Sequence, residues 1–276
     1  KTGIMESKDG DRLNFLVKGQ KLKPVVGDNV IWIKQQDGTI VVTKILEPTN
    51  KIERLNQYGQ QQVIASNVTQ ILLITAPLPK PNFLLIDKFL LISELMDCDL
   101  SIIFNKLDLV ENTDHQLQLY QKLDYPVIRI SAIEKINLNP LFNLLSQQTT
   151  VLVGQSGVGK STIINLLIDK DKIRTEKLSN KNKKGKHTTS TSTMHSVQSN
   201  GYLIDTPGVE NLNPIIFDIK QIENGFREIA SLSSACKYRD CIHIKEPNCA
   251  VNQAMIDNKI TTQRYNNYKK LVEDFQ

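Results

Sequence analysis

A glycine-rich stretch provides the first recognisable chemistry of this sequence. Gly154-Gln155-Ser156-Gly157-Val158-Gly159-Lys160-Ser161 has the G-x-x-x-x-G-K-[ST] spacing of a phosphate-binding loop. Glycine lets backbone N–H groups close around phosphate oxygens because no Cβ stands in the way, and the N-terminus of a following helix adds positive potential. In such a loop the ammonium of Lys160 reaches the β- and γ-phosphates, and the hydroxyl of Ser161 ligates Mg²⁺. We therefore predict that residues 154–161, together with Thr162, bind a nucleoside triphosphate.

A second phosphate motif follows further along the chain. Asp205-Thr206-Pro207-Gly208 comes 45 residues after Lys160 and directly after the apolar run Gly201–Ile204. The carboxylate of Asp205 can hold the water shell of the Mg²⁺ ion, and the backbone N–H of Gly208 can meet the γ-phosphate. Loss of that phosphate would then release the loop, which is how many nucleotide switches work.

Two short motifs predict a site for the base. The motif Asn105-Lys106-Leu107-Asp108 ends an apolar run, and Ser131-Ala132 ends the next one. The carboxylate of Asp108 can accept hydrogen bonds from guanine N1–H and the 2-amino group, whereas adenine would leave the buried charge unpaired. We expect Asn105 to brace the neighbouring loops, the stem of Lys106 to lie on the base, and the small residue at 132 to let a backbone N–H approach guanine O6.

The order of these motifs is unusual, because the base motifs precede the phosphate motifs. In most GTPases they follow them. A circular permutation preserves such a site, since all of these loops still lie at the C-terminal ends of strands. The permuted order also leads the chain from Gly208 straight into a cysteine-rich tail.

The tail predicts a metal centre. Cys236-x₄-Cys241-x-His243-x₅-Cys249 offers three thiolates and one imidazole, which is a donor set for structural Zn²⁺. Clustered cysteines in a chain without a secretion signal point to metal rather than to disulfides. No further acid or ligand stands out near them, so we expect a closed, non-catalytic site. Cys98 lies apart, and we expect it to be a core residue.

Strand-like and helix-like stretches alternate between residues 66 and 220, which we assign as one domain. The runs expected to form buried strands are Ile71–Thr75, Ile102–Asn105, Val127–Ile130 and Val151–Val153. The stretches expected to form helices are residues 83–96, 114–123, 139–147 and 160–168. This alternation predicts an α/β fold with a mostly parallel, doubly wound sheet. Residues 170–195 have few large apolar groups and are expected to form a mobile loop.

Two smaller domains are expected to flank the α/β domain. Residues 1–65 contain β-rich runs at Val25–Val26, Val30–Ile33 and Thr39–Ile45, with a turn at Asp37-Gly38, which predicts a small antiparallel barrel. We recognise no strand ahead of Val25, and we expect Trp32 to lie in the core. Residues 221–276 are expected to form an α-helical metal-binding domain with helices near 250–257 and 261–274.

Composition narrows the class of protein. Of the 276 residues, 40% are apolar, which excludes wholesale disorder. The longest apolar runs are far below the ~18 residues that span a bilayer, and no signal peptide is recognised, so we expect a soluble, cytoplasmic protein that does not contact membranes. The net charge is +5, but residues 170–186 carry eight Lys or Arg side chains against two acids. Such a run is often only a solvated face, although its place between two phosphate motifs favours contact with a polyanion.

In this order the motifs resemble those of the RsgA (YjeQ) family, the circularly permuted bacterial GTPases of small-ribosomal-subunit maturation. The resemblance extends to Gly185-Lys186-His187-Thr188-Thr189, to Pro24-Val25-Val26-Gly27-Asp28, and to the tail motifs Glu246-Pro247-x-Cys249-Ala250-Val251 and Arg264-Tyr265-x-x-Tyr268. It implies an N-terminal OB-fold that binds RNA, a permuted GTPase domain and a zinc domain. It also implies GTP hydrolysis that the small ribosomal subunit stimulates, with contacts to its rRNA.

The resemblance also implies roles for residues 187–189. Thr188 or Thr189 is expected to supply the second Mg²⁺-binding hydroxyl, and the sequence does not choose between them. Val209 stands where many GTPases place a glutamine that orients the attacking water, and valine cannot do so. In this family His187 is the candidate for that catalytic role, although a solvated loop histidine is the plainer interpretation.

Two other functions stay open at this point. GTP could stabilise an RNA-binding module in which turnover is incidental. The protein could also be a P-loop kinase or ATPase, although Asp108 disfavours adenine. Our main interpretation is a GTP hydrolase that acts as a checkpoint in late maturation of the small ribosomal subunit, requires Mg²⁺, contains one structural Zn²⁺ and is a monomer.

Overall fold

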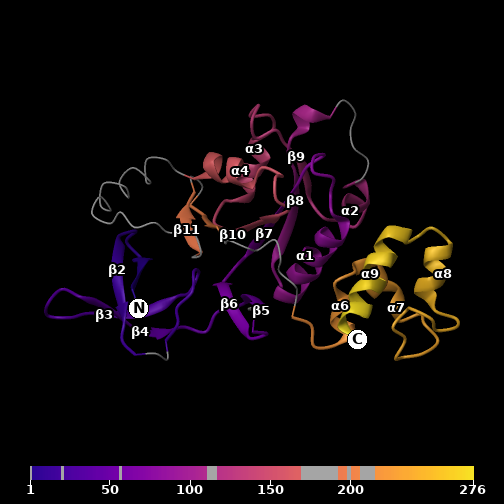
Figure 1. Cartoon of the computed structure of the whole chain (residues 1–276), viewed down its shortest axis with the longest axis horizontal. Coiled ribbons are helices and arrows are strands. Elements are labelled where there is room, and N and C mark those ends of the chain that lie inside the picture. Colours follow the sequence, from indigo (N-terminus) through magenta and orange to yellow (C-terminus); the bar gives the residue numbers. More distant parts are fainter. Residues whose placement is uncertain are drawn as a thin grey trace.

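The computed structural model describes residues 2–19, 22–55, 58–110, 117–168, 192–197, 200–205 and 215–276, and every structural statement below concerns these residues. Three groups of elements follow one another across the molecule (Figure 1). The N-terminal strands lie at one end, a central sheet with helices occupies the middle, and the C-terminal helices form the other end. None of the helices in these ranges combines the length and the hydropathy that a membrane-spanning helix requires.

The central sheet contains six strands within the described residues. In spatial order they are β11 (Thr193–Ser196), β12 (Tyr202–Asp205), β10 (Thr149–Gly154), β7 (Gln70–Thr75), β8 (Asp99–Phe104) and β9 (Val127–Arg129). All neighbouring strands are parallel except β11, which pairs antiparallel with β12. Strand β7 is buried at every position, because a parallel sheet covered on both faces needs apolar side chains on both.

Helices cover both faces of this sheet. The elements involved are α1 (Phe83–Met96), the 3₁₀ turn η1 (Leu107–Leu109), α2 (Gln118–Lys122), α3 (Asn139–Leu144) and α4 (Lys160–Leu167). Alternate residues of β7 point to opposite faces, so that Leu73 joins a core with α1 and α2, whereas Leu72 joins a second core with α3 and α4. The predicted doubly wound α/β arrangement is thus confirmed, with strand and helix ends shifted by a few residues.

The position of helix α1 explains why its sequence is apolar on all sides. Its N-cap residue Asn82 accepts a hydrogen bond from Leu85 N, and the helix ends at Asp97 in a left-handed conformation. Phe89 and Leu90 pack against the sheet, whereas Leu91 packs into the core of the C-terminal helices. A helix wedged between two cores must be apolar on both sides.

The N-terminal region differs from the expectation in three respects. A four-stranded sheet has the order β1 (Thr2–Glu6), β2 (Arg12–Val17), β4 (Ile40–Ile45) and β3 (Val30–Lys34), and β5 (Lys51–Leu55) pairs with β6 (Gln61–Ser66). Strands β1, β2, β5 and β6 were not predicted, and the pairing of β2 with β4 is parallel rather than antiparallel. Trp32 is 37% exposed on the edge strand β3, so its expected place in the core is wrong.

The C-terminal region is helical, as predicted. It contains α6 (Ile219–Asn224), α7 (Arg227–Ser233), α8 (Ala250–Ile256) and α9 (Thr262–Phe275). Their shared core includes Phe226 and Tyr268, whose rings meet edge to face with centroids 5.4 Å apart. One further expectation is corrected nearer the middle of the chain: residues 193–195 belong to β11 rather than to a loop.

Candidate functional site

The glycine-rich loop connects β10 to α4 at the C-terminal edge of the sheet. Gly154 has φ +140°, and a Cβ there would lie 2.1 Å from the carbonyl oxygen of Ile74. Gly159 has φ +98°, and its Cβ would lie 2.3 Å from Asn105 Nδ2. Only glycine fits at both positions, because side chains are strained in these conformations and the neighbouring atoms leave no room. The glycine-rich loop therefore packs closely against β7 and against the loop that contains Asn105.

Polar side chains of this loop face its own backbone and the neighbouring loop. Lys160 Nζ donates to the carbonyl oxygens of Gly154 (2.8 Å) and Gln155 (2.7 Å). The Gln155 side chain accepts a hydrogen bond from the backbone N–H of Asn82 at 3.0 Å. Ser161 is exposed in the first turn of α4, where helix N–H groups lack partners and favour an anion. Of the other residues predicted to bind phosphate, Ser156, Gly157 and Thr162 are exposed, whereas Val158 is buried.

Asn105 joins the two halves of the candidate nucleotide site. Its side chain is 2% exposed. Its Nδ2 donates to Val158 O at 2.9 Å, and its Oδ1 accepts from Ala132 N at 3.0 Å. A buried amide with both ends paired fixes its neighbours closely, because each lost bond would leave a desolvated polar group. The expected brace between the phosphate and base motifs is therefore present.

The base motif residues lie beside this brace. Lys106, at φ +63°, donates from Nζ to Leu78 O and to Gly157 O, each at 2.7 Å. The hydroxyl of buried Ser131 donates to the Asp108 carboxylate and accepts from Glu134 N at 3.1 Å. Asp108 is itself exposed. Its second carboxylate oxygen carries no bond to Ser131, which leaves acceptor capacity on the surface of the site.

Asp205 lies at the same edge of the sheet. It ends β12, whose parallel register with β10 places Ile204 opposite Val151. Two parallel neighbours end at the same edge, so the exposed carboxylate of Asp205 lies on the side where the glycine-rich loop begins. The other residues predicted at the phosphate end, Gly208, His187, Thr188 and Thr189, lie outside the described residues.

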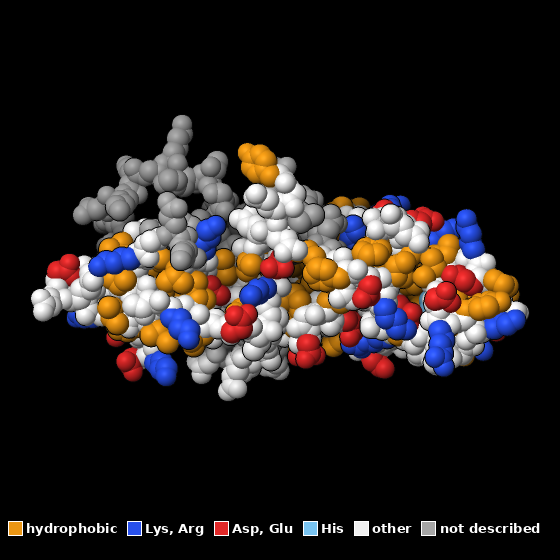
Figure 2. Space-filling view, turned by 90° about the horizontal axis from the view of Figure 1, so that it is seen from below, with side chains coloured by type: hydrophobic (Ala, Val, Ile, Leu, Met, Phe, Trp, Pro, Cys, Tyr) orange, Lys and Arg blue, Asp and Glu red, His pale blue; other side chains and the backbone are white. Residues whose placement is uncertain are grey.

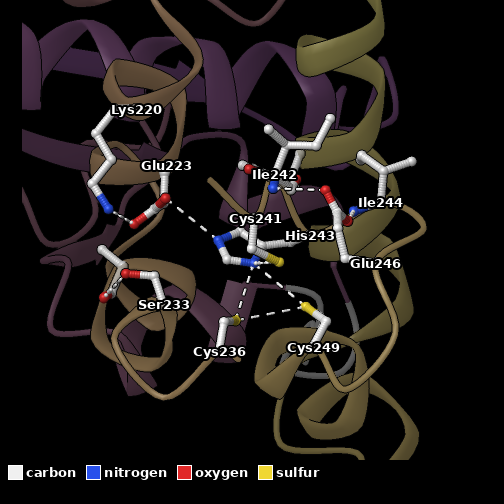
Figure 3. Close-up of polar contacts among 12 residues, drawn as sticks. Lys220, Glu223, Ser233, Cys236, Cys241, Ile242, His243, Ile244, Glu246 and Cys249 are labelled. Atoms are coloured by element: carbon white, nitrogen blue, oxygen red, sulfur yellow. Dashed lines mark hydrogen bonds and ion pairs between the residues drawn. The ribbon is translucent and has the colours of Figure 1, made fainter. Parts of the chain in front are cut away.

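The cysteine cluster forms a compact donor set in the C-terminal region (Figure 3). Nδ1 of His243 lies 3.5 Å from Cys236 Sγ, 3.3 Å from Cys241 Sγ and 3.4 Å from Cys249 Sγ. The sulfur atoms of Cys236 and Cys249 are 3.8 Å apart. A tetrahedral zinc ion with ordinary bond lengths separates two sulfurs by about 3.8 Å, and sulfur from nitrogen by about 3.5 Å. The four residues therefore fit a zinc ion.

The cluster is mostly buried, so ionising its thiols is costly unless a metal ion binds them. Burial raises the pKa of the Cys241 thiol to about 12. A cation must offset that cost before the sulfur can act as a thiolate ligand. His243 is 1% exposed and Cys249 4% exposed, so water has little access and the site is closed.

Sequence reasoning did not identify two carboxylates that support the cluster. Glu246 accepts backbone hydrogen bonds from Ile242 (2.9 Å), Ile244 (2.9 Å) and Lys245 (3.0 Å), which fixes the turn that carries His243. Burial opposes the charge, but these bonds outweigh it and lower the pKa of Glu246. Glu223 faces His243 from α6 and lies 13 residues before Cys236, so the spacing of the cluster residues gives no indication of it.

Two cavities lie away from both sites. They measure about 250 and 440 Å³ and share the lining residues Asp97, Cys98 and Asp99, where α1 ends and β8 begins. Cys98 packs partly against the core, and burial raises the pKa of its thiol to about 12. None of the nucleotide motif residues lines these cavities.

Comparisons with known proteins show what the chain resembles. Residues 45–214 match the family model described as RsgA GTPase. A relative from Histophilus somni (strain 129Pt), named small ribosomal subunit biogenesis GTPase RsgA, is 35% identical over 97% of this chain and 79% of its own length. A relative of the same name from Haemophilus influenzae (strain PittGG) is 36% identical over 90% of this chain and 75% of its own.

Two solved structures share the fold. YjeQ from Thermotoga maritima superposes with a TM-score of 0.75 at 27% identity, covering 99% of this chain and 94% of that one. YloQ, described as a circularly permuted GTPase, gives a TM-score of 0.74 at 28% identity, covering 99% and 90%. The permuted order of base and phosphate motifs thus has solved counterparts.

Proposed function

This chain belongs to the RsgA family of small ribosomal subunit biogenesis GTPases, and from that premise we propose how its residues bind and hydrolyse GTP. The single observation that carries the proposal is the hydrogen bonding of Asn105 to Val158 O and Ala132 N. It makes one site out of motifs that are far apart in the chain and in permuted order. A base and a triphosphate bound there would belong to the same molecule.

The phosphate end uses the glycine-rich loop. Residues 154–162 would surround the phosphates, with Lys160 leaving its loop carbonyls to meet the β- and γ-oxygens. Mg²⁺, which supplies charge neutralisation when bound with GTP, would be held by Ser161 and by Thr188 or Thr189. Asp205 would hold its water shell, and Gly208 would contact the γ-phosphate.

The base end selects guanine. The carboxylate of Asp108 would accept the two guanine donors while Ser131 holds its other oxygen, and the N–H of Ala132 would face guanine O6. The Lys106 ammonium is fixed against Gly157 O, so that its stem can line the base face. Adenine offers neither donor, so the Asp108 oxygen that faces the base would lose its partner to bound adenine, which disfavours adenine.

The flanking regions would serve the ribosome. We assign residues 1–65 as an OB-fold, 66–220 as the GTPase domain and 221–276 as a domain with one structural zinc. Figure 2 shows hydrophobic side chains reaching the surface at the end that carries the N-terminal strands, with Lys, Arg, Asp and Glu side chains between them. Ile31, Trp32 and Ile33 are all exposed on β3 and offer stacking and apolar contact to rRNA of the small subunit, with basic side chains for its phosphates.

The test is a GTP hydrolysis assay across a titration of purified small ribosomal subunits. We expect slow turnover alone and a saturable increase with subunits, and we expect GTP and GDP, but not ATP, to compete for the site. A rate that the subunits leave unchanged would favour an RNA-binding module with incidental turnover. Equal competition by ATP would contradict the base site.

A further inference from the structure

The His243 ring has two nitrogen atoms in different environments. Nδ1 faces the three cysteine sulfurs at 3.3–3.5 Å. Nε2 faces away from them and lies 3.4 Å from Oε2 of Glu223 (Figure 3). An imidazole that ligates through one nitrogen carries its proton on the other. The carboxylate of Glu223 therefore stands where that N–H must find an acceptor.

Glu223 is itself held in place. Its side chain is 5% exposed, and it belongs to α6, one turn after Lys220, whose ammonium pairs with its Oε1. Lys220 is 62% exposed, so its charge remains hydrated while it neutralises the buried carboxylate. Fixed by this pair, Glu223 presents its second oxygen to His243 with little freedom to turn away.

Hydrogen bonds also hold the backbone around His243. The orientation of the imidazole ring is a separate question, because these bonds do not involve its nitrogen atoms. Tyr265 OH donates to His243 O at 2.9 Å, and Tyr268 OH donates to Ile242 O at 3.1 Å. These bonds from α9 hold the peptide groups, and the Tyr268 ring lies beside the imidazole with centroids 6.1 Å apart, but none of these contacts is a hydrogen bond to Nε2. Among the polar contacts of the described residues, only the one with Glu223 acts on Nε2.

We propose that Glu223 is a positioning residue of the zinc centre, whose carboxylate accepts the Nε2–H of His243 and keeps Nδ1 directed at the metal. The inference rests on the proposed zinc site. Partners of this kind fix the tautomer and raise the basicity of the ligand, and their loss costs roughly 10- to 100-fold in metal affinity. Because α6 is the first described helix after Asp205, the contact also ties the metal centre to the chain that leaves the phosphate motif.

The experiment compares zinc release from the full-length wild-type protein and from Glu223→Gln and Glu223→Ala. Zinc content is measured by elemental analysis, and release to excess chromogenic chelator is followed in the absence of nucleotide and ribosomes. We expect stoichiometric zinc in the wild type, and release at least 10-fold faster from Glu223→Ala. Glu223→Gln keeps an acceptor oxygen without the charge, so its release rate should lie between the two.

The matched control is Glu94→Gln, which removes a carboxylate that pairs with Arg227 Nε at 2.7 Å on another helix. It should release zinc at the wild-type rate. The proton shift of His243 Nε2–H in ¹⁵N-labelled protein gives a second measurement, and it should move upfield in Glu223→Gln if the strong acceptor is lost. Unchanged release and an unchanged proton shift in both Glu223 variants would overturn the proposal. Absence of zinc from the wild type would instead contradict the metal site itself.

Discussion

Arg264 and Asp87 form a fully buried ion pair, with Arg264 Nη1 2.6 Å from Asp87 Oδ1. Asp87 lies on α1 against the central sheet, and Arg264 lies on α9 in the C-terminal region. Glu228 on α7 pairs with the same guanidinium through Nε at 2.6 Å and Nη2 at 3.0 Å. Tyr120 and Asn267 donate to Asp87 at 2.8 and 2.6 Å. Every charged atom of the pair thus has partners, which is the condition under which such a pair can be kept in a dry interior.

Replacing Arg264 by methionine is expected to lower the free energy of unfolding by about 3–5 kcal/mol, because it leaves the buried carboxylate of Asp87 without its counter-charge. Urea denaturation followed by circular dichroism measures this. Lys269→Met on the same helix is the control, since Lys269 makes only a loose pair with Glu273 at 3.7 Å. If Arg264→Met lowers the free energy of unfolding no more than the control does, the ion pair does not contribute to stability.

Replacing Gly159 by alanine is expected to weaken GTP binding and to displace Asn105, because the new Cβ would overlap Asn105 Nδ2. Gly10→Ala is the control: Gly10 also has a positive φ, of +84°, but a Cβ there meets nothing within 4 Å. Both substitutions are expected to lower the stability of the fold by roughly 1–2 kcal/mol, because alanine is strained at positive φ. Only Gly159→Ala should also reduce nucleotide affinity, because only its Cβ meets a residue of the site. Fluorescent GTP titration distinguishes the two, and equal affinities in both variants would contradict this role of the close contact.

Replacing Asp108 by asparagine is expected to weaken GTP binding by roughly 10- to 100-fold, the cost of losing one hydrogen bond to a charged group. Xanthosine triphosphate should bind relatively better, because its C2 carbonyl can accept from the new amide. Competition between the two nucleotides measures the change. A variant that still prefers GTP as strongly as the wild type would exclude Asp108 from base recognition.

Replacing His187 by alanine is expected to lower the subunit-stimulated rate of GTP hydrolysis by roughly 100-fold while leaving GTP affinity intact, as for other residues that handle the proton or position the attacking water. The resemblance to the family and the valine at position 209 carry this prediction, since both residues lie outside the described ranges. His195→Ala is the control, because His195 on β11 contacts Thr193 at 3.1 Å and is assigned no role. A normal stimulated rate in His187→Ala would refute it.

Local patterns predicted the central elements well. Helix α1 spans Phe83–Met96 as expected, since a long apolar stretch with an N-cap asparagine leaves few alternatives. Strands β1 and β2 were missed although Arg12–Val17 carries alternating apolar residues after an Asp-Gly turn. Neither strand has a run of β-branched residues, and both are only half-buried, so their sequence pattern is weak. Trp32 was misplaced because a lone tryptophan gives no indication of which face of a strand is covered.

The candidate site shows the same limit. Motif spacing predicted the candidate residues 105–108, 131–132 and 154–161 and the four residues of the Cys/His cluster, because each motif is local. Contacts such as Asn82 with Gln155 or Glu223 with His243 join segments far apart in the chain. Which side chains meet there depends on how helices pack, and no spacing rule encodes it. The functional groups could therefore be predicted from the sequence, whereas the distant residues that orient them could not.

The position of α1 between two cores has a consequence for dissecting the protein. Leu91 is fully buried among C-terminal side chains, and a Cβ on Gly225 would lie 2.2 Å from its Cδ1. An excised central fragment that ends before α6 would expose this apolar side of α1 to water. It would also leave the carboxylate of Asp87 without its partner Arg264. The α/β and helical portions should consequently melt in one transition, and truncation should yield an insoluble product rather than an autonomous GTPase.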